Sequence, residues 1–384
     1  MNLAPVIGDD PRDILRALKS ALHGAGPALG LGLVSGLPGE VRPGTAVVVT
    51  TSGSTGIPKS VILSRDALTA SALATADRVG EGAWLLALPA SYVAGMQVLV
   101  RSIVADREPA ILSGSFTPQS FAATALMMAS SERGQRVPTY TSLVPAQLTT
   151  LLDAAEEDGN VLTALRSFET ILVGGQALPP VTLERAEAAG ARIVRTYGST
   201  ETCGGCVYDG VPLRGVKVRV EHGEVQIAGP TLAEGYLGDE ELTDAAFLRA
   251  PDGTRWYRTG DAGLFDDGRV RVRGRIDNVI VSGGVNISLD RVERVVRTVP
   301  GLADAVVVGV PDERWGEASV VVAIRGESLR RSESVQLEEA RAAVKEQIGP
   351  HARPSRLVLV DELATLPSGK PDREAIRRAV AALH

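Results

Sequence analysis

The sequence predicts an α/β protein with a large N-terminal domain, a β-rich subdomain within it, and a small C-terminal α+β domain. Along the first half of the chain, short apolar runs rich in β-branched residues alternate with helical patterns, which is typical of an α/β fold. Over residues 215–273 the pattern changes to short alternating strands interrupted by Gly and Asp. After Arg275, helical and strand patterns alternate again. The length of 384 residues is enough for two or three domains.

The first elements are expected from capping residues and apolar runs. A helix is predicted over 11–22, because an aspartate suited to the N-cap precedes a proline suited to the first turn. The Gly- and Pro-rich stretch 24–44 predicts loops. Residues 46–49 form a short apolar run with β-branched side chains, which favours a buried strand. A second apolar run ends at Ser64, which can cap a helix over 65–79.

Further strands and helices are expected downstream. The predicted strands cover residues 84–88, 171–173, 192–194, 216–220, 224–227, 305–310 and 319–324. The predicted helices cover residues 95–105, 146–156, 181–189, 289–298 and 337–348. A change of pattern near residues 275–278 predicts a boundary between an N-terminal domain, 1–276, and a C-terminal domain, 277–384.

Composition and charge argue against several classes of protein. The 40 basic and 46 acidic residues give a net charge of −6, which disfavours a general nucleic-acid or anionic-membrane surface. The N-terminus lacks the basic and apolar regions of a secretory signal, and no apolar run approaches the ~18 residues that a membrane-spanning helix needs. The only cysteines are Cys203 and Cys206, so no disulfide framework is expected. We therefore expect a cytoplasmic protein with no nucleic-acid partner and no membrane insertion.

The strongest local signal is a loop dense in hydroxyl residues and glycines, Thr50-Thr51-Ser52-Gly53-Ser54-Thr55-Gly56-Ile57-Pro58-Lys59. Such a backbone can close its N–H groups around a phosphate chain, and Lys59 could add a positive charge. The spacing nearly fits a Walker phosphate loop. Pro58, however, stands where the second glycine should be and has no N–H to offer, so a kinase or GTPase is disfavoured. The ordinary alternative is a surface loop without a ligand.

Two further segments carry a carboxylate beside a turn. In Tyr197-Gly198-Ser199-Thr200-Glu201, a hydroxyl and a carboxylate side by side can position a magnesium ion on nucleotide phosphates. Tyr197 could lie against a base. In Tyr257-Arg258-Thr259-Gly260-Asp261, an aspartate after a tight turn could accept hydrogen bonds from ribose hydroxyls. A hairpin turn capped by Asp261 explains this second segment equally well.

Two glycine-containing segments complete the set. The fourth covers residues 274–284 and ends in the pair Gly283-Gly284. The fifth is Leu366-Pro367-Ser368-Gly369-Lys370, close to the C-terminus. A lysine beside Pro and Gly is held on an ordered turn, so its ammonium group can be aimed. A solvated surface lysine is the ordinary alternative.

In this order and spacing, the five segments resemble the adenylate-forming superfamily of acyl-CoA synthetases, luciferases and peptide-synthetase adenylation domains. The resemblance runs from about residue 46 to 373 and includes residues 171–175, 235–237 and 308–317. It implies the adenylate-forming fold, in which a small C-terminal domain moves on a large AMP-binding domain. The implied activity is that of an ATP-dependent, AMP-forming carboxylate–CoA ligase. ATP, Mg²⁺, coenzyme A and a small carboxylic acid are the implied ligands.

The resemblance implies which residues bind ATP. The phosphate-binding loop would comprise Thr51, Ser52, Gly53, Ser54, Thr55, Gly56 and Lys59. Gly174, Gly175 and Gln176 would lie along the adenine, with Tyr197 and Gly198 beside the nucleotide. Asp261 and Arg275 match the positions that bind the ribose.

The same resemblance implies the catalytic residues and the moving parts. Thr200 would contact the α-phosphate, and Glu201 would be the carboxylate linked to magnesium. Lys370 would stabilise the transition state of adenylation. Asp277 would be the hinge about which the C-terminal domain rotates, and the Gly283-Gly284 turn would line the channel for the pantetheine arm of CoA.

Within the superfamily, the run Thr141-Ser142-Leu143-Val144-Pro145-Ala146-Gln147-Leu148 looks like the o-succinylbenzoate–CoA ligases of menaquinone biosynthesis. Ser142 and Tyr92 are the expected residues of the substrate pocket, and Tyr92 departs from the histidine of many relatives. Only 49 residues precede Thr50, so a shortened first subdomain is expected. A homodimer is a further expectation from the family.

Three alternatives stay open. The chain could be a ligase for another aryl or aliphatic acid, an adenylating enzyme that loads a carrier-protein thiol, or a nucleotide-binding regulator without catalysis. Lys370, Glu201 and Asp261 argue against the regulator. The Cys203–Cys206 spacing suggests a redox or zinc site, but neither a thioredoxin-like context nor two further ligands are evident, so ordinary residues near the acyl pocket are favoured.

Overall fold

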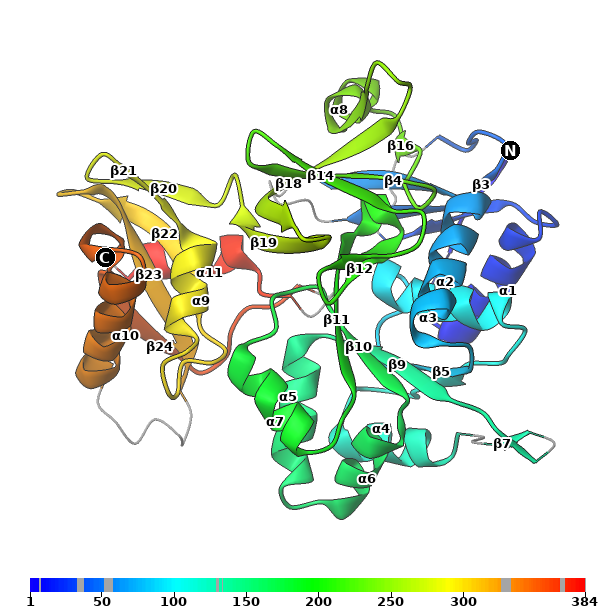
Figure 1. The fold of residues 1–384 in the computed structure, drawn as a ribbon, viewed down its shortest axis with the longest axis horizontal. Helices are drawn as coiled ribbons and strands as arrows, with labels where there is room; N and C mark the ends of the chain where they lie inside the picture. The colour runs from blue at the N-terminus through cyan, green and yellow to red at the C-terminus, as the bar shows by residue number, and fades with distance from the viewer. Residues whose placement is uncertain are drawn as a thin grey trace.

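The computed structural model describes residues 1–6, 8–32, 38–51, 58–128, 131–132, 134–325, 333–366 and 370–383, with only the backbone of residue 132. Helices pack on several β-sheets to form a large N-terminal part and a small C-terminal part (Figure 1). The predicted α/β fold class is therefore confirmed. Within the described ranges, no helix combines the length and apolar character that crossing a bilayer requires.

The first sheet lies near the N-terminus. Its strands follow the order β1 (Leu3–Pro5), β2 (Ala28–Leu31), β3 (Thr45–Thr51), β4 (Lys59–Ser64) and β16 (Gly235–Tyr236). Helix α1 (Pro11–Leu22) has the predicted bounds and buries Ile14 and Leu18. The prediction of loops over 24–44 is wrong at β2, whose buried residues pair in parallel with β1 and β3. Long-range pairing here outweighs the local preference of Gly and Pro for turns.

The second sheet forms the centre of the N-terminal part. Its order is β13 (Val211–Pro212), β12 (Gly204–Tyr208), β11 (Ile193–Ser199), β10 (Thr170–Val173), β9 (Thr139–Leu143), β5 (Ala83–Leu86) and β6 (Ala110–Ile111). From β11 to β6 the strands are parallel. The segments that follow β9, β10 and β11 therefore emerge at one edge of the sheet, where ligands of α/β proteins commonly bind.

Helices cover both faces of this sheet. One face packs on α2 (Arg65–Val79) and α3 (Val93–Val104). The other packs on α4 (Pro118–Leu126), α5 (Pro145–Ala155), α6 (Gly159–Ser167) and α7 (Pro180–Ala188). Trp84 and Leu86 belong to the first core and Leu85 to the second, as the alternation of side chains along a strand requires. A short ribbon of β7 (Ser131–Glu132) and β8 (Gln135–Arg136) extends from this part (Figure 1).

A third, antiparallel sheet contains the strands predicted over residues 216–227. It consists of β14 (Lys217–Glu221), β15 (Glu224–Ala228), β18 (Arg255–Asp266), β17 (Phe247–Arg249) and β19 (Arg269–Arg275), with α8 (Glu240–Ala246) beside it. Strands β18 and β19 pair so that Asp261 lies opposite Arg275. The register of this hairpin thus places the two residues predicted to bind ribose side by side.

The C-terminal part has its own sheet and cores. Its strands are β21 (Val285–Ser288), β20 (Val279–Ser282), β23 (Gly316–Ile324), β22 (Val306–Asp312) and β24 (Arg356–Val360). Its helices are α9 (Leu289–Val296), α10 (Glu333–Gln347) and α11 (Arg373–Ala381). One face of the sheet packs on α9 and α10, and the other packs on α11. Among the described residues, no core cluster joins side chains from both sides of Asp277. This separation supports the boundary at 276/277, which stays a prediction.

Candidate active site

The predicted phosphate-binding loop connects β3 to β4. Thr51 and Lys59 face each other across these antiparallel strands, and the Thr51 hydroxyl donates to the Lys59 carbonyl oxygen at 3.4 Å. The Lys59 ammonium lies 5.6 Å from the centroid of the Tyr236 ring. The predicted loop residues Ser52, Gly53, Ser54, Thr55 and Gly56 lie outside the described residues. The two ends of the loop therefore meet beside Tyr236.

The glycines predicted to follow the adenine lie directly after β10. A Cβ atom on Gly174 would come within 2.2 Å of the Thr196 hydroxyl oxygen, so the position accepts only glycine. Gly175 has a φ of +84°, and a Cβ there would lie 3.5 Å from Cε of Lys370. Gln176 is half-buried in the same segment. A bare backbone thus forms one wall of the site, with Lys370 against it.

The end of β11 carries the predicted α-phosphate and magnesium residues. Thr200 and Glu201 begin a short 3-10 turn, η1 (Thr200–Thr202). Glu201 Oε1 accepts a hydrogen bond from the Tyr236 hydroxyl at 2.9 Å. Burial raises the pKa of Tyr236, and the Glu201 carboxylate raises it further. Gly198 has no room for a side chain, because a Cβ would lie 2.1 Å from the Gly204 carbonyl oxygen. The turn is therefore held tightly against β12.

Asp261 lies in a small polar network. Its Oδ2 accepts a hydrogen bond from the Tyr197 hydroxyl at 2.6 Å, and its Oδ1 is 3.5 Å from Nη1 of Arg275. Arg275 also makes a bidentate pair with Asp277, at 2.9 and 3.0 Å. Burial raises the pKa of Asp261, while Tyr197 and Arg275 oppose the shift. The hydrogen bond to Asp277 raises the pKa of Arg275. The predicted ribose and hinge residues are therefore in direct contact.

Lys370 reaches this site from the C-terminal part. Its carbonyl oxygen accepts a hydrogen bond from Leu366 N at 2.7 Å, which closes the turn, although residues 367–369 lie outside the described ranges. The residue as a whole is exposed, yet desolvation by the surrounding protein lowers the pKa of Lys370. The carboxylates of Glu201 and Asp261 oppose that shift. The last segment of the chain thus lies against Gly175, which follows β10, on the side of the site that carries Glu201 and Asp261.

The two residues predicted to contact the substrate lie near α3. Tyr92 is the N-cap residue of α3 and is half-buried. Burial raises the pKa of Tyr92, and the Asp9 carboxylate adds to the shift. Ser142, on β9, is buried and accepts a hydrogen bond from Arg101 Nη1 at 3.4 Å. Tyr92 and Arg101 therefore lie towards opposite ends of one helix, with β9 alongside.

Arg101 is a functional candidate that the sequence prediction missed. The side chain is buried, stacks on Trp84 at 4.8 Å and donates to the Tyr208 hydroxyl at 3.4 Å. Its Nε has no hydrogen-bond partner, and no carboxylate pairs with it among the described residues. Burial lowers the pKa of Arg101. A buried cation that makes no ion pair within the described residues suggests a missing anion. In the sequence, Arg101 could have been noticed because it directly follows the mostly apolar run Met96-Gln97-Val98-Leu99-Val100.

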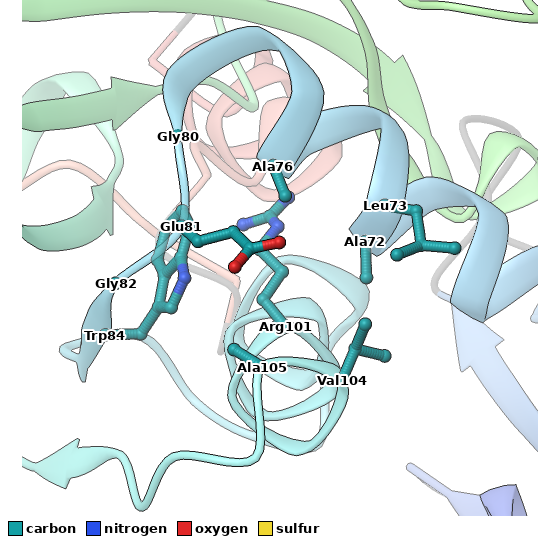
Figure 2. A pocket seen from close by; sticks show the side chains of 10 residues that line it. All are labelled: Ala72, Leu73, Ala76, Gly80, Glu81, Gly82, Trp84, Arg101, Val104 and Ala105. Carbon is teal, nitrogen blue, oxygen red and sulfur yellow. The ribbon is translucent and has the colours of Figure 1, made fainter.

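A small cavity borders Arg101. It is lined by residues of α2, α3 and the segment 80–84, including Arg101, Trp84 and Glu81 (Figure 2). Its volume of about 40 Å³ holds a few water molecules at most. It is too small to receive an organic acid, so we do not assign it to a substrate.

A larger cavity, of about 580 Å³, lies in the C-terminal part. Its lining residues include Gly283, Trp315, His351 and Arg353. Gly283 N donates to the Trp315 carbonyl oxygen at 2.8 Å, and Gly284 completes the turn between β20 and β21. Of the two predicted pantetheine residues, Gly283 thus lines this cavity, and Gly284 follows it in the chain.

Magnesium would fit beside Glu201. The described residues contain no cluster of three or more His, Cys, Asp and Glu side chains that could hold a metal ion alone. Mg²⁺, however, commonly takes one or two protein carboxylates and completes its shell with water and phosphate oxygens. A single carboxylate next to the phosphate loop suits that arrangement.

Cys203 and Cys206 are both buried and free. Cys203 ends the 3-10 turn with a φ of +53°, and Cys206 lies in β12. Burial raises the pKa of both thiols, that of Cys206 to about 12. Neither is a reactive thiolate near neutral pH.

Comparison with known proteins gives matches along most of the chain. A family model described as AMP-binding enzyme matches residues 36–237, and one described as AMP-binding enzyme C-terminal domain matches residues 291–370. A protein of Mycobacterium tuberculosis named probable 2-succinylbenzoate–CoA ligase is 40% identical over 381 residues, covering 96% of this chain and 95% of its own. The 2-succinylbenzoate–CoA ligase of Bacillus pumilus is 30% identical, covering 87% and 68%.

Among solved structures, the O-succinylbenzoate coenzyme A synthetase of Bacillus subtilis in complex with AMP is similar to this chain. It is 26% identical, with a TM-score of 0.70 and coverage of 87% of this chain and 69% of its own.

Proposed function

Because the chain belongs to the AMP-binding enzyme family, we propose that it is an ATP-dependent, AMP-forming ligase that converts 2-succinylbenzoate to its CoA thioester. The observation that carries the reaction class is the approach of Lys370 to Gly175, where the carboxylates of Glu201 and Asp261 act electrostatically on its ammonium group. The substrate is inferred from the names of the relatives and from the unpaired cation at Arg101. The reaction would be a step of menaquinone biosynthesis.

In the first step, a carboxylate oxygen of the acid attacks the α-phosphorus of ATP, and the bond to pyrophosphate breaks. Negative charge concentrates on the phosphoryl oxygens, so fixed positive groups stabilise the transition state. Lys370 supplies such a charge, and Thr200 can donate its hydroxyl to an α-phosphate oxygen. Mg²⁺, held at Glu201, would neutralise phosphate charge when bound. Asp261 and Arg275 orient the ribose, which fixes the phosphate relative to the acid.

In the second step, the thiol sulfur of CoA attacks the acyl carbon, and AMP leaves with the bonding electron pair. Lys370 fills part of the site after adenylation, so its withdrawal by rotation about Asp277 would admit the thiol. Rotation of a small domain about a short hinge is an established way to control when a second substrate enters an active site.

We place the nucleotide end of CoA in the larger C-terminal cavity. Its volume of about 580 Å³ suits a small-molecule ligand. The Trp315 ring is half exposed and offers a surface on which adenine can stack. Arg353 brings positive charge for the phosphates, whereas the charge of Arg341 is paired with Glu338. The adjoining Gly283-Gly284 turn would guide the pantetheine arm.

We assign the second carboxylate of the acid to Arg101. An acid with two carboxylates would bury its unreacted anion, which is costly unless a cation pairs with it. Arg101 donates a hydrogen bond to Ser142 and has an unused Nε donor. A monocarboxylic acid would leave this cation buried and unpaired, so the site favours a dicarboxylic acid.

The proposal is tested by supplying MgATP, CoA and a panel of acids, namely 2-succinylbenzoate, benzoate, 4-coumarate, acetate and octanoate, and measuring AMP and acyl-CoA together. Turnover of 2-succinylbenzoate above all others is expected. Turnover of another acid would keep the reaction and replace the substrate. AMP without acyl-CoA would indicate a carrier-protein thiol, and absence of AMP with every acid would contradict the enzymatic proposal.

Assembly and location complete the proposal. We infer a cytoplasmic homodimer, in keeping with the family resemblance. Light scattering should then give twice the chain mass of 40.2 kDa. A single chain mass at micromolar concentration would contradict the dimer.

Replacing Asp277 by proline should spare adenylation and impair thioester formation, because the ring fixes φ at the proposed hinge. Asp277 also pairs with Arg275, so the substitution removes an ion pair as well. Asp277→Ala, which removes the pair but leaves φ free, is the matched control. Each half-reaction is measured separately. Thioester formation by Asp277→Pro at the rate of Asp277→Ala would rule out the hinge.

Replacing Asp261 by asparagine should raise the KM for ATP by about 10- to 100-fold, since a charged hydrogen bond to the ribose is lost. The pKa of Asp261 is raised in the folded protein, so its ionised carboxylate lowers the stability of the fold near neutral pH. This destabilisation is relieved as the pH falls through the pKa of Asp261 in the folded protein. The variant should therefore melt no lower than wild type at pH 7. Wild-type ATP affinity should start to weaken at a less acidic pH than an ordinary aspartate would give. A variant with an unchanged KM for ATP would refute the assignment.

A further inference from the structure

A second polar side chain of α3, Gln97, is buried without partners. Only 1% of it is exposed, and neither Nε2 nor Oε1 has a hydrogen-bond partner. Buried amides are nearly always paired, so a residue that leaves both polar atoms unused calls for an explanation. The small cavity at Arg101 does not provide one, because Gln97 does not line it.

Gln97 lies beside the active site. A Cβ on Gly204 would lie 3.3 Å from Cγ of Gln97, and Gly204 pairs with Ser199 across β11 and β12. Gln97 therefore packs on the strand that follows the η1 turn carrying Thr200 and Glu201. It precedes Arg101 by one helical turn, or about 6 Å along the axis. It follows Tyr92, at the start of the helix, by a little more than one turn.

A purely structural role does not account for this residue. Its neighbours on α3, Met96 and Val98, are fully buried apolar side chains, and an apolar residue of similar length would fill the same space without an unpaired amide. Positions that break such a local rule are commonly functional.

We propose that Gln97 is a specificity-determining residue whose carboxamide binds the keto oxygen of the acid. This inference rests on the proposed function. In 2-succinylbenzoate the keto group lies between the carboxylate that is activated and the carboxylate on the ring. Gln97 packs on Gly204, two residues after the η1 turn, and precedes Arg101 by one helical turn. Nε2 of Gln97 donates to the keto oxygen. An acid that has no hydrogen-bond acceptor at the position of the keto group leaves the amide unpaired.

The test combines one substitution with one change of substrate. Gln97→Met keeps the length of the side chain and removes the amide. The acids are 2-succinylbenzoate and 4-(2-carboxyphenyl)butanoate, in which a methylene replaces the keto group. The kcat/KM of the variant for the keto acid should fall by about 10- to 100-fold, while that for the methylene acid should change less than about threefold.

Two further measurements separate recognition from packing. The variant should melt no lower than wild type in the absence of ligand, because the amide it loses makes no hydrogen bond. Met96→Leu, a similar change in the buried core of the same helix, should affect both acids equally.

The outcomes distinguish this inference from the function on which it rests. If the wild type uses 2-succinylbenzoate but Gln97→Met loses kcat/KM equally for both acids, the role of Gln97 is overturned and the proposed function stands. Failure of the wild type to use 2-succinylbenzoate would overturn the proposed function and this inference with it.

Discussion

Replacing Lys370 by alanine is expected to slow acyl-adenylate formation by about 10²- to 10³-fold, which is typical when one preorganised electrostatic group is removed. Lys370 is the cation that the C-terminal part brings to Gly175, Glu201 and Asp261. Its contribution is needed most when charge concentrates on the α-phosphate. The second half-reaction should be nearly unaffected, because thioester formation follows the withdrawal of this lysine.

The two half-reactions are measured separately, by ATP–pyrophosphate exchange and by CoA thioester formation from chemically prepared acyl-adenylate. The protonated lysine is the active form, and desolvation lowers its pKa. Wild-type exchange should therefore decline with rising pH, beginning below the range of an ordinary lysine. Thioester formation should lack this particular decline. Equal losses in both half-reactions of Lys370→Ala would contradict the assignment.

The sequence suggests candidate site residues more readily than it predicts the folding pattern around them. Segments such as Tyr197–Glu201 and Lys370 are short, and their backbone requirements are local, so they can be recognised without a structure. The placement of Asp261 opposite Arg275 follows from the register of one hairpin. The meeting of Lys370 with Gly175 is different, because it joins two cores that pack separately.

Interactions between distant segments explain what the sequence did not reveal. Strand β2 lies within a Gly- and Pro-rich stretch and exists because it pairs with β1 and β3. Gln97 and Arg101 occupy an apolar helical run, in which polar residues ordinarily face solvent. Only the packing of α3 against β9 and β12 shows that both are buried and that neither has a full set of partners. A missing partner becomes visible only in three dimensions.

Replacing Arg101 by methionine is expected to lower kcat/KM for 2-succinylbenzoate by about 10²- to 10³-fold, because removing one partner of a buried charge pair leaves the other unpaired. The same variant should use 4-oxo-4-phenylbutanoate, which lacks the ring carboxylate, as well as wild type or better. Arg101→Lys, which keeps the charge but loses the planar donor geometry, should give an intermediate loss for the dicarboxylic acid.

This reversal of preference distinguishes recognition from support of the fold. Arg101 stacks on Trp84 and donates to Ser142 and Tyr208, so its loss could also disturb packing. A packing defect would reduce turnover of both acids together and lower the melting temperature. A loss confined to the dicarboxylic acid, with an unchanged KM for ATP, would identify Arg101 as the partner of the second carboxylate. Equal losses for both acids would instead show that the buried guanidinium supports the sheet, and the acid preference would then have to arise elsewhere along α3.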